Sequence, residues 1–294
     1  MAERLFDEAF LRRLDSISLR FDEALNGTFS GGRRSRQHGS TVEYSGFRDY
    51  VQGDDFRRID WNAYGRFEKF FIRLFLDERQ LETRIFVDVS ESMDSGTPSK
   101  MITALRTAAA IAYVSASAQD RVSIITLSGG KAEELVTGMN GRQGFYSSLE
   151  RIEGVASGGT TDLCASLKDY RGFTGGTGAA VLITDLMTGE GWRDALKYLL
   201  YRKQQVFLIQ ILSPEETDPR LDGAVRLTDS EDGSFCDIAN APAAVEYYRR
   251  ALADYCDEIS SFCLRSGIRY LRAGSDEDES EIIFGKGTAA GIFA

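Results

Sequence analysis

From residue 80 onward, short apolar runs alternate with longer segments of helical periodicity. The runs TRIFVDVS, RVSIITLS, AAVLITDL, QQVFLIQIL and IRYLRA have the length and apolar content of strands. Between them, apolar residues at helical spacing predict helices at about 100–118, 144–152, 162–170, 191–202 and 242–266. This succession predicts an α/β fold, with a mostly parallel sheet and helices on both of its faces.

The residues before this region form an N-terminal extension with a different pattern. Residues 3–25 carry apolar side chains at helical spacing and predict one or two amphipathic helices, whereas residues 69–78 alternate like a strand. We therefore divide the chain into an extension with helical and β elements at 1–79, the α/β domain at 80–275 and a C-terminal tail at 276–294. The tail opens with the acidic run DEDESE, which is expected to be solvated.

Charge and hydropathy narrow the class of protein. With 35 basic and 45 acidic residues, the formal charge is −10 at pH 7. This is the wrong sign for a surface that follows phosphates, so nucleic acid is not expected as the main partner. No stretch reaches the roughly 18 consecutive apolar residues of a membrane span, and the N-terminus lacks the apolar segment of a secretory signal. We therefore expect no membrane span and a cytoplasmic location.

The numbers and spacing of the cysteines and histidines argue against zinc sites and catalytic triads. The four cysteines include no CxxC pair and are expected to be buried free thiols. The single histidine, His38, excludes histidine-based zinc sites and catalytic triads. No GxxxxGK[ST] motif is present, which disfavours a phosphate-binding loop of that kind. A basic loop containing Arg33, Arg34 and Arg36 is interpreted either as solvated or as a contact for an anion or partner.

Side chains that carry oxygen gather where predicted strands end or helices begin. Asp88, Ser90 and Ser92 follow the first strand of the α/β region as Asp-x-Ser-x-Ser. A glycine turn at 157–162 leads into a helix, and Asp185 follows the strand AAVLIT. Because ligands bind at the carboxyl ends of parallel strands, these hard oxygen donors suit Mg²⁺ or Mn²⁺. For Asp-x-Ser-x-Ser alone, a polar cap on the following helix is the alternative.

This order of residues resembles the von Willebrand factor A fold with its metal-ion-dependent adhesion site, which has the pattern Asp-x-Ser-x-Ser, then Thr, then Asp. The matching positions are Asp88, Ser90, Ser92, Thr161 and Asp185. Thr160 is the alternative for the threonine. The resemblance covers residues 80–275 and implies that a bound Mg²⁺ keeps one coordination position open for a carboxylate of a partner protein.

The block EYSGFRDYVQGDDFRRIDWN at residues 43–62 resembles the signature of a bacterial family called domain of unknown function 58. That signature reads Arg-x-Tyr-x-Pro-Gly-Asp-Asp-x-Arg-x-Ile-Asp-Trp and precedes a metal-site domain. Here Gln52 stands in place of the usual proline. The resemblance implies an adaptor that works with a MoxR-type AAA+ ATPase in the chaperone-like remodelling or maturation of client proteins.

The same block sets arginines beside aspartates and interleaves them with aromatic residues. Arginine–carboxylate pairs are expected to hold a compact and mostly irregular subdomain. A second interpretation is a face that docks a partner, because Arg and Trp are favoured at interface hot spots. The candidates for that role are Arg48, Arg57 and Trp61.

Two functions fit these residues. The leading hypothesis is a non-enzymatic, Mg²⁺-dependent interaction protein that serves the ATPase and its clients. The alternative is a Mg²⁺-dependent phosphatase in which Asp88 is the nucleophile. Against the phosphatase, Ser90 stands where such enzymes carry a second aspartate, and no lysine stands in an obvious place to bind a phosphate.

Overall fold

A computed structural model of the chain describes residues 6–21, 44–51, 56, 59–75, 81–160, 162–173, 177–187, 191–221, 223–228, 234–238 and 240–294. The chain divides into two units. The larger unit comprises Met1–Arg20 and Leu81–Ala294, and the smaller one comprises Phe21–Gln80. The N-terminal segment therefore belongs to the α/β unit, although the chain between the two parts of that unit forms the separate smaller unit.

The larger unit is built on a six-stranded sheet with the strand order β10-β7-β6-β3-β4-β5. The strands are β3 (Glu82–Asp88), β4 (Arg121–Ser128), β5 (Lys131–Met139), β6 (Gly178–Thr184), β7 (Gln204–Leu212) and β10 (Arg269–Gly274). All neighbouring strands are parallel except β4 and β5, which are antiparallel. The predicted α/β fold with a mostly parallel sheet is confirmed.

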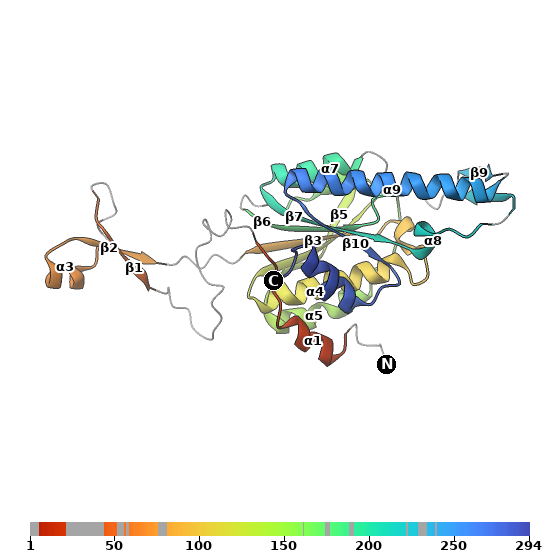
Figure 1. Ribbon diagram of the computed structural model, residues 1–294. Coiled ribbons are helices and arrows are strands. Elements are labelled where there is room, and N and C mark those ends of the chain that lie inside the picture. The colour runs from red at the N-terminus through yellow and green to blue at the C-terminus, as the bar shows by residue number, and fades with distance from the viewer. Residues whose placement is uncertain are drawn as a thin grey trace. The chain divides into compact units, whose positions relative to one another are not determined.

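Helices cover both faces of this sheet (Figure 1). One face carries α6 (Leu163–Asp169), α7 (Gly191–Tyr201) and α9 (Ala241–Ser266). The other face carries α4 (Lys100–Ser117) and α5 (Gly141–Glu153), and α1 (Glu8–Leu14) packs against α4. Because both faces are covered, β6 and β7 are buried along their whole lengths, which explains why their sequences are continuous apolar runs.

The region between β7 and α9 contains short elements that the sequence patterns did not reveal. They are α8 (Pro214–Thr217) and an antiparallel hairpin of β8 (Val225–Thr228) and β9 (Phe235–Ile238). α8 has only four residues, so it shows no helical periodicity. The Ser213 side chain accepts a hydrogen bond from the backbone of Glu216, whose own side chain bonds back to the Ser213 backbone, forming a capping box at its start.

The acidic run at 276–281 is exposed or half-buried, as expected for a solvated segment, but the C-terminal residues beyond it pack against the rest of the α/β unit. Within the acidic run, Glu279 forms an ion pair with Arg106 of α4 at 2.6 Å. The π-helix η3 (Glu281–Gly287) follows. The apolar side chains beyond the run are the physical reason, since Ile282, Ile283, Ile292 and Phe293 are all buried.

The two ends of the larger unit are joined through their backbones. Leu19 and Phe293 form an antiparallel bridge. The amide of Ser18 donates to the carbonyl of Ala294 at 3.0 Å, and the amide of Ala294 donates back at 2.9 Å. Of the amphipathic helices predicted in residues 3–25, the described part contains the single short helix α1.

The smaller unit contains regular structure, which corrects the expectation of a mostly irregular subdomain. β1 (Tyr44–Asp49) pairs antiparallel with β2 (Phe71–Phe75), which lies within the strand predicted at 69–78. Between them, α3 (Trp61–Phe67) begins at Asp60, whose carboxylate accepts from the amides of Asn62 and Ala63. Asp60 thus caps a helix. The arginines near it in the sequence had instead suggested arginine–carboxylate pairs.

Two further expectations concern cysteines and membrane spans. All four cysteines are free; Cys256 and Cys263 are buried as expected, whereas Cys164 is only half-buried. Cys236 is exposed, contrary to expectation, because it lies on β9, whose residues are exposed or only partly buried. Within the described ranges, no helix combines the length and apolar character needed to cross a bilayer.

Candidate metal centre

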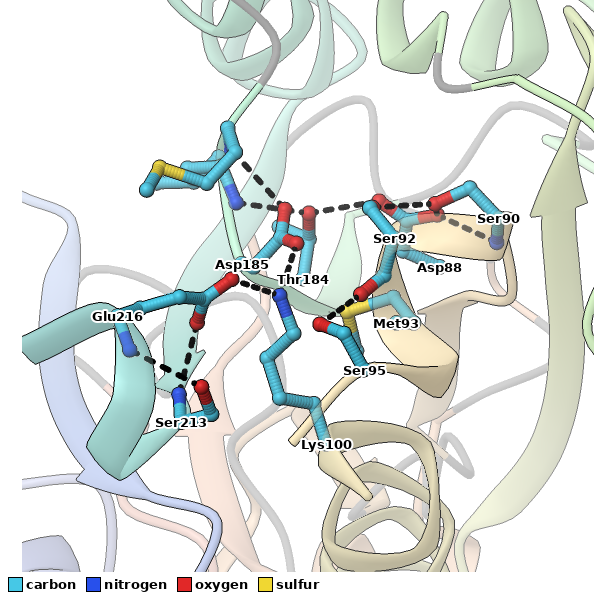
Figure 2. Close-up of polar contacts among 12 residues, drawn as sticks. Asp88, Ser90, Ser92, Met93, Ser95, Lys100, Thr184, Asp185, Ser213 and Glu216 are labelled. Carbon is cyan, nitrogen blue, oxygen red and sulfur yellow. Dashed lines mark hydrogen bonds and ion pairs between the residues drawn. The ribbon is translucent and has the colours of Figure 1, made fainter. Parts of the chain in front are cut away.

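The site begins where β3 ends (Figure 2). Asp88 is the last residue of that strand and its side chain is almost fully buried. The amide and the hydroxyl of Ser90 both donate to Asp88 Oδ1, at 3.1 and 2.8 Å. The chain then enters the short 3₁₀-helix η2 (Glu91–Asp94), which brings Ser92 Oγ within 3.1 Å of Ser90 Oγ. The Asp-x-Ser-x-Ser segment therefore converges as its spacing predicted.

The neighbouring strand β6 brings two further oxygen-bearing side chains to the same edge of the sheet. β3 and β6 run parallel and in register, with Val87 opposite Ile183. Thr184 therefore reaches across, and its hydroxyl donates to Asp88 Oδ2 at 2.8 Å. Asp185 follows directly and is fully buried. Its Oδ1 accepts from the amide of Met187 at 2.9 Å.

The third predicted element, the glycine turn, is tied to the same edge by backbone hydrogen bonds. The amide of Gly158 donates to the carbonyl of Val89 at 2.9 Å, and the amide of Glu91 donates to the carbonyl of Gly159 at 3.0 Å. Gly159 has a φ of +78°, and a Cβ there would lie 2.5 Å from Ser128 Oγ. The turn thus requires glycine in order to approach the strand ends closely.

The threonine predicted as a ligand, Thr161, lies outside the described residues, so its role stays a prediction. The alternative, Thr160, is described, and its carbonyl accepts from the amide of Gly129 at 2.8 Å. Asp162 caps α6 by accepting from the amide of Ala165 at 2.9 Å.

Sequence reasoning missed two charged members of the cluster, Lys100 and Glu216. The ammonium of Lys100 donates to Asp185 Oδ2 at 2.7 Å and also pairs with Glu216 Oε1 (Figure 2). The Lys100 side chain is 0% exposed and that of Glu216 is 21% exposed. The only local signal was a lysine at the start of α4, and Glu216 sits on a helix too short to be predicted.

Burial and like charge determine the protonation of the first carboxylate. Burial, followed by the nearby charge of Asp185, raises the pKa of Asp88 to about 6, although hydrogen bonds from Ser90 and Thr184 oppose this. For Lys100, burial works to lower the pKa, but Asp185 and Glu216 outweigh it and raise the pKa above its usual value. The two carboxylates therefore favour the cationic form of the lysine, while Asp88 is a carboxylate whose charge is poorly compensated.

The cluster fits a small divalent cation. Three carboxylates and one ammonium leave it with a formal charge of −2 when all are ionised. Adjacent ligands of an octahedral Mg²⁺ are about 3.0 Å apart, given metal–oxygen distances near 2.1 Å. The 3.1 Å between the hydroxyls of Ser90 and Ser92 is close to that separation. In the part of the chain that is described, no three His, Cys, Asp or Glu side chains are grouped to hold a metal, so hydroxyls would have to contribute.

The residues predicted to dock a partner belong to the smaller unit. Trp61 is 61% exposed, and its ring contacts those of Tyr64 and Phe70 at centroid distances of 6.2 and 6.3 Å. Arg48 is also exposed. The third candidate, Arg57, falls outside the described residues, as do His38 and the basic loop at 33–36.

Comparison of the sequence with models of known protein families shows the family of this chain. Residues 46–255 match the family described as "Protein of unknown function DUF58", which is more than half of the chain. The chain belongs to the DUF58 family. Curated relatives include uncharacterized proteins of Mycobacterium tuberculosis (strain ATCC 25618 / H37Rv) and Mycobacterium bovis (strain ATCC BAA-935 / AF2122/97). Each is 27% identical over 277 residues, which cover 92% of this chain and 87% of the relative.

Solved structures similar to this DUF58 protein include von Willebrand factor A domains, as the sequence resemblance implied. The conserved hypothetical protein BatB of Bacteroides thetaiotaomicron is 17% identical, with a TM-score of 0.42, covering 71% of this chain and 98% of that one. A von Willebrand factor type A protein of Catenulispora acidiphila is 12% identical, with a TM-score of 0.37, covering 75% of this chain and 43% of that one. Such distant similarity assigns no function.

Proposed function

We propose that this DUF58 protein is a non-enzymatic adaptor that binds partner proteins through a divalent cation, with Mg²⁺ preferred and Mn²⁺ as a substitute. The observation that carries the proposal is the oxygen cluster at the carboxyl edge of the sheet. There Asp88, Ser90 and Asp185 come together with a net charge of −2, counting the Lys100 and Glu216 side chains. Hard oxygen ligands with this charge match one divalent ion.

Each residue has a definite task in this proposal. The hydroxyls of Ser90 and Ser92 and the carboxylate of Asp88 hold the ion, and Thr161 and Asp185 complete the ligand set. An ion held by these residues would offer a coordination position to a carboxylate of the partner. The hydrogen bonds from Ser90 and Thr184 keep the Asp88 carboxylate oriented before the ion arrives.

The partner we propose is a MoxR-type AAA+ ATPase, together with the client proteins that it remodels or matures. This step rests on the DUF58 family resemblance. The sequence has no GxxxxGK[ST] motif, so the proposal leaves nucleotide hydrolysis to the partner. We place this action in the cytoplasm, and we assign a second contact to the smaller unit, where Arg48 and Trp61 are each exposed.

One observation in the structure favours the phosphatase alternative, but two observations stand against it. The sequence suggested no lysine for a phosphate, yet Lys100 lies in the cluster beside Asp185. Its ammonium, however, is already shared by two carboxylates. In addition, Ser90 stands where such phosphatases carry a second aspartate as acid and base. We therefore favour the adaptor.

A binding experiment with a purified MoxR-type ATPase from the same organism tests the proposal. The ATPase should be retained by the immobilised protein in Mg²⁺ and released by a chelator. Asp88→Ala/Ser90→Ala should abolish retention, whereas Ser147→Ala, an exposed serine of α5, should not. Retention that persists in chelator would contradict metal dependence. Hydrolysis of a generic phosphate ester that Asp88→Asn abolishes would favour the phosphatase instead.

A further inference from the structure

A lysine is buried at the start of a helix, where two physical rules oppose it. Lys100 is the first residue of α4, and a cation there faces the positive end of the helix dipole. Its side chain is fully buried, although lysine is almost never fully buried unless it is paired. Residues that break local rules in this way are often retained for function rather than for folding.

Two carboxylates from separate elements hold this ammonium in place (Figure 2). Asp185 follows β6, and Glu216 belongs to α8. Each carboxylate uses one oxygen for a backbone amide and the other for Lys100: Asp185 accepts from Met187 at 2.9 Å, and Glu216 accepts from Ser213 at 2.7 Å. The three side chains therefore form a fixed array, because both partners of the lysine are themselves anchored.

The array controls the charge that a metal ion would meet. With Lys100 present, the carboxylates of Asp88, Asp185 and Glu216 leave a net charge of −2. Without the ammonium the same groups would carry −3, and without the charge of Glu216 they would carry −1. Charge–charge interactions in a buried cluster are strong, so each unit changes ion preference considerably.

We propose that Lys100 is a built-in counter-cation that makes the candidate metal centre select a divalent ion over a trivalent one. This role rests on the proposed function, since it presumes that the centre binds metal. Lys100 is then a specificity-determining residue that acts through Asp185 and does not itself contact the ion. Glu216 keeps the ammonium in position from the far side.

Calorimetric titration of Mg²⁺ and La³⁺ into chelator-treated protein tests this role. The same titrations of the Asp88→Ala/Ser90→Ala variant measure ion binding elsewhere on the acidic surface, and only the binding that this variant lacks is assigned to the site. Lys100→Gln should shift the ratio of the two dissociation constants toward La³⁺ by about tenfold or more, and Glu216→Gln should shift it toward Mg²⁺. Lys100→Arg keeps the positive charge, so where this variant folds, its ratio should lie within about twofold of the parent's.

The outcomes separate this inference from the proposed function. If the parent binds neither ion at the site, the metal-dependent function fails and this role fails with it. If the parent binds Mg²⁺ but Lys100→Gln and Glu216→Gln both keep the parent's ratio of Mg²⁺ to La³⁺ dissociation constants, only the role of Lys100 is overturned. Should Lys100→Gln fail to fold by circular dichroism, Glu216→Gln decides alone, because its partly exposed side chain can be neutralised with less disruption.

Discussion

The hydroxyl of Thr184 donates to Asp88 Oδ2 at 2.8 Å and thereby joins the ends of two neighbouring parallel strands. The same hydroxyl oxygen accepts from the amide of Leu186 at 3.1 Å. Leu186 has a positive φ of 59°, so the chain turns sharply there. Thr184 thus fixes both the first carboxylate of the candidate centre and the turn that presents the second, Asp185.

Replacing this threonine with valine should destabilise the fold. Thr184→Val keeps the shape but leaves Asp88 Oδ2 and the amide of Leu186 without their partner, at a cost of about 1–3 kcal/mol. Urea denaturation measures the change. Thr126→Val on β4 is the control, because its hydroxyl bond to Glu133 is exposed and long, at 3.4 Å. Equal losses in the two variants would refute the importance of the Thr184 bond.

Ionisation of Asp88 should reduce stability in metal-free protein as the pH rises. Its pKa is about 6 in the folded chain, against 3.8 for the ordinary residue. Between these values the unfolded chain loses its proton while the folded chain keeps it, so the contribution of this group falls by about 3 kcal/mol in total from about pH 4 to above pH 6.

Asp88→Asn isolates this effect, because the variant lacks the titrating group. Measured by urea denaturation in chelator, the stability of Asp88→Asn relative to the parent should be greater near pH 7.5 than near pH 4 by about 3 kcal/mol. A difference between variant and parent that does not change with pH would disprove the raised pKa.

Gly159 should be intolerant of a side chain, whereas its neighbour should tolerate one. Gly159→Ala places a Cβ on left-handed backbone, which costs about 1–2 kcal/mol, and also forces Ser128 to move. Gly158→Ala is the matched control, because a Cβ there meets nothing within 4 Å. Thermal unfolding should show a much larger loss for Gly159→Ala. Similar melting temperatures for both variants would mean that the turn does not need its close approach to the strands.

Trp61 should matter for partner binding but little for stability. Its ring is 61% exposed, so Trp61→Ala removes little buried surface and should change the free energy of unfolding by less than about 1 kcal/mol. The same variant should weaken retention of the MoxR-type ATPase. Tyr201→Ala, at an 80% exposed position of α7, serves as the control. Undiminished ATPase retention by Trp61→Ala would remove this residue from the docking face.

The sequence predicted the parts of the site that depend on local spacing. Asp88, Ser90 and Ser92 could be grouped because they directly follow a recognisable buried strand, and Asp185 because it follows another. That these residues lie close together followed from the rule that parallel strands end at the same edge of the sheet. The strands and long helices of the α/β unit were predictable for the same reason, since each has enough residues to show a period.

The parts that were missed depend on contacts distant in the chain. Lys100 and Glu216 lie 116 residues apart and meet only because α4 and α8 approach the same strand ends. The acidic run near the C-terminus suggested solvent by its composition. The run is indeed exposed or half-buried, but the apolar residues beyond it, such as Ile282 and Phe293, are buried, and the acidic composition gave no sign of that. Charge content alone could not reveal either packing arrangement.

The most direct test of the account is calorimetric titration of Mg²⁺ into the chelator-treated protein, alongside the Asp88→Ala/Ser90→Ala variant and the Ser147→Ala control. We expect saturable binding of one ion by the parent and the control, and none by the double variant. Equal binding by all three proteins, or no binding by the parent even in the presence of a carboxylate-bearing partner ATPase, would contradict a metal centre at the end of β3.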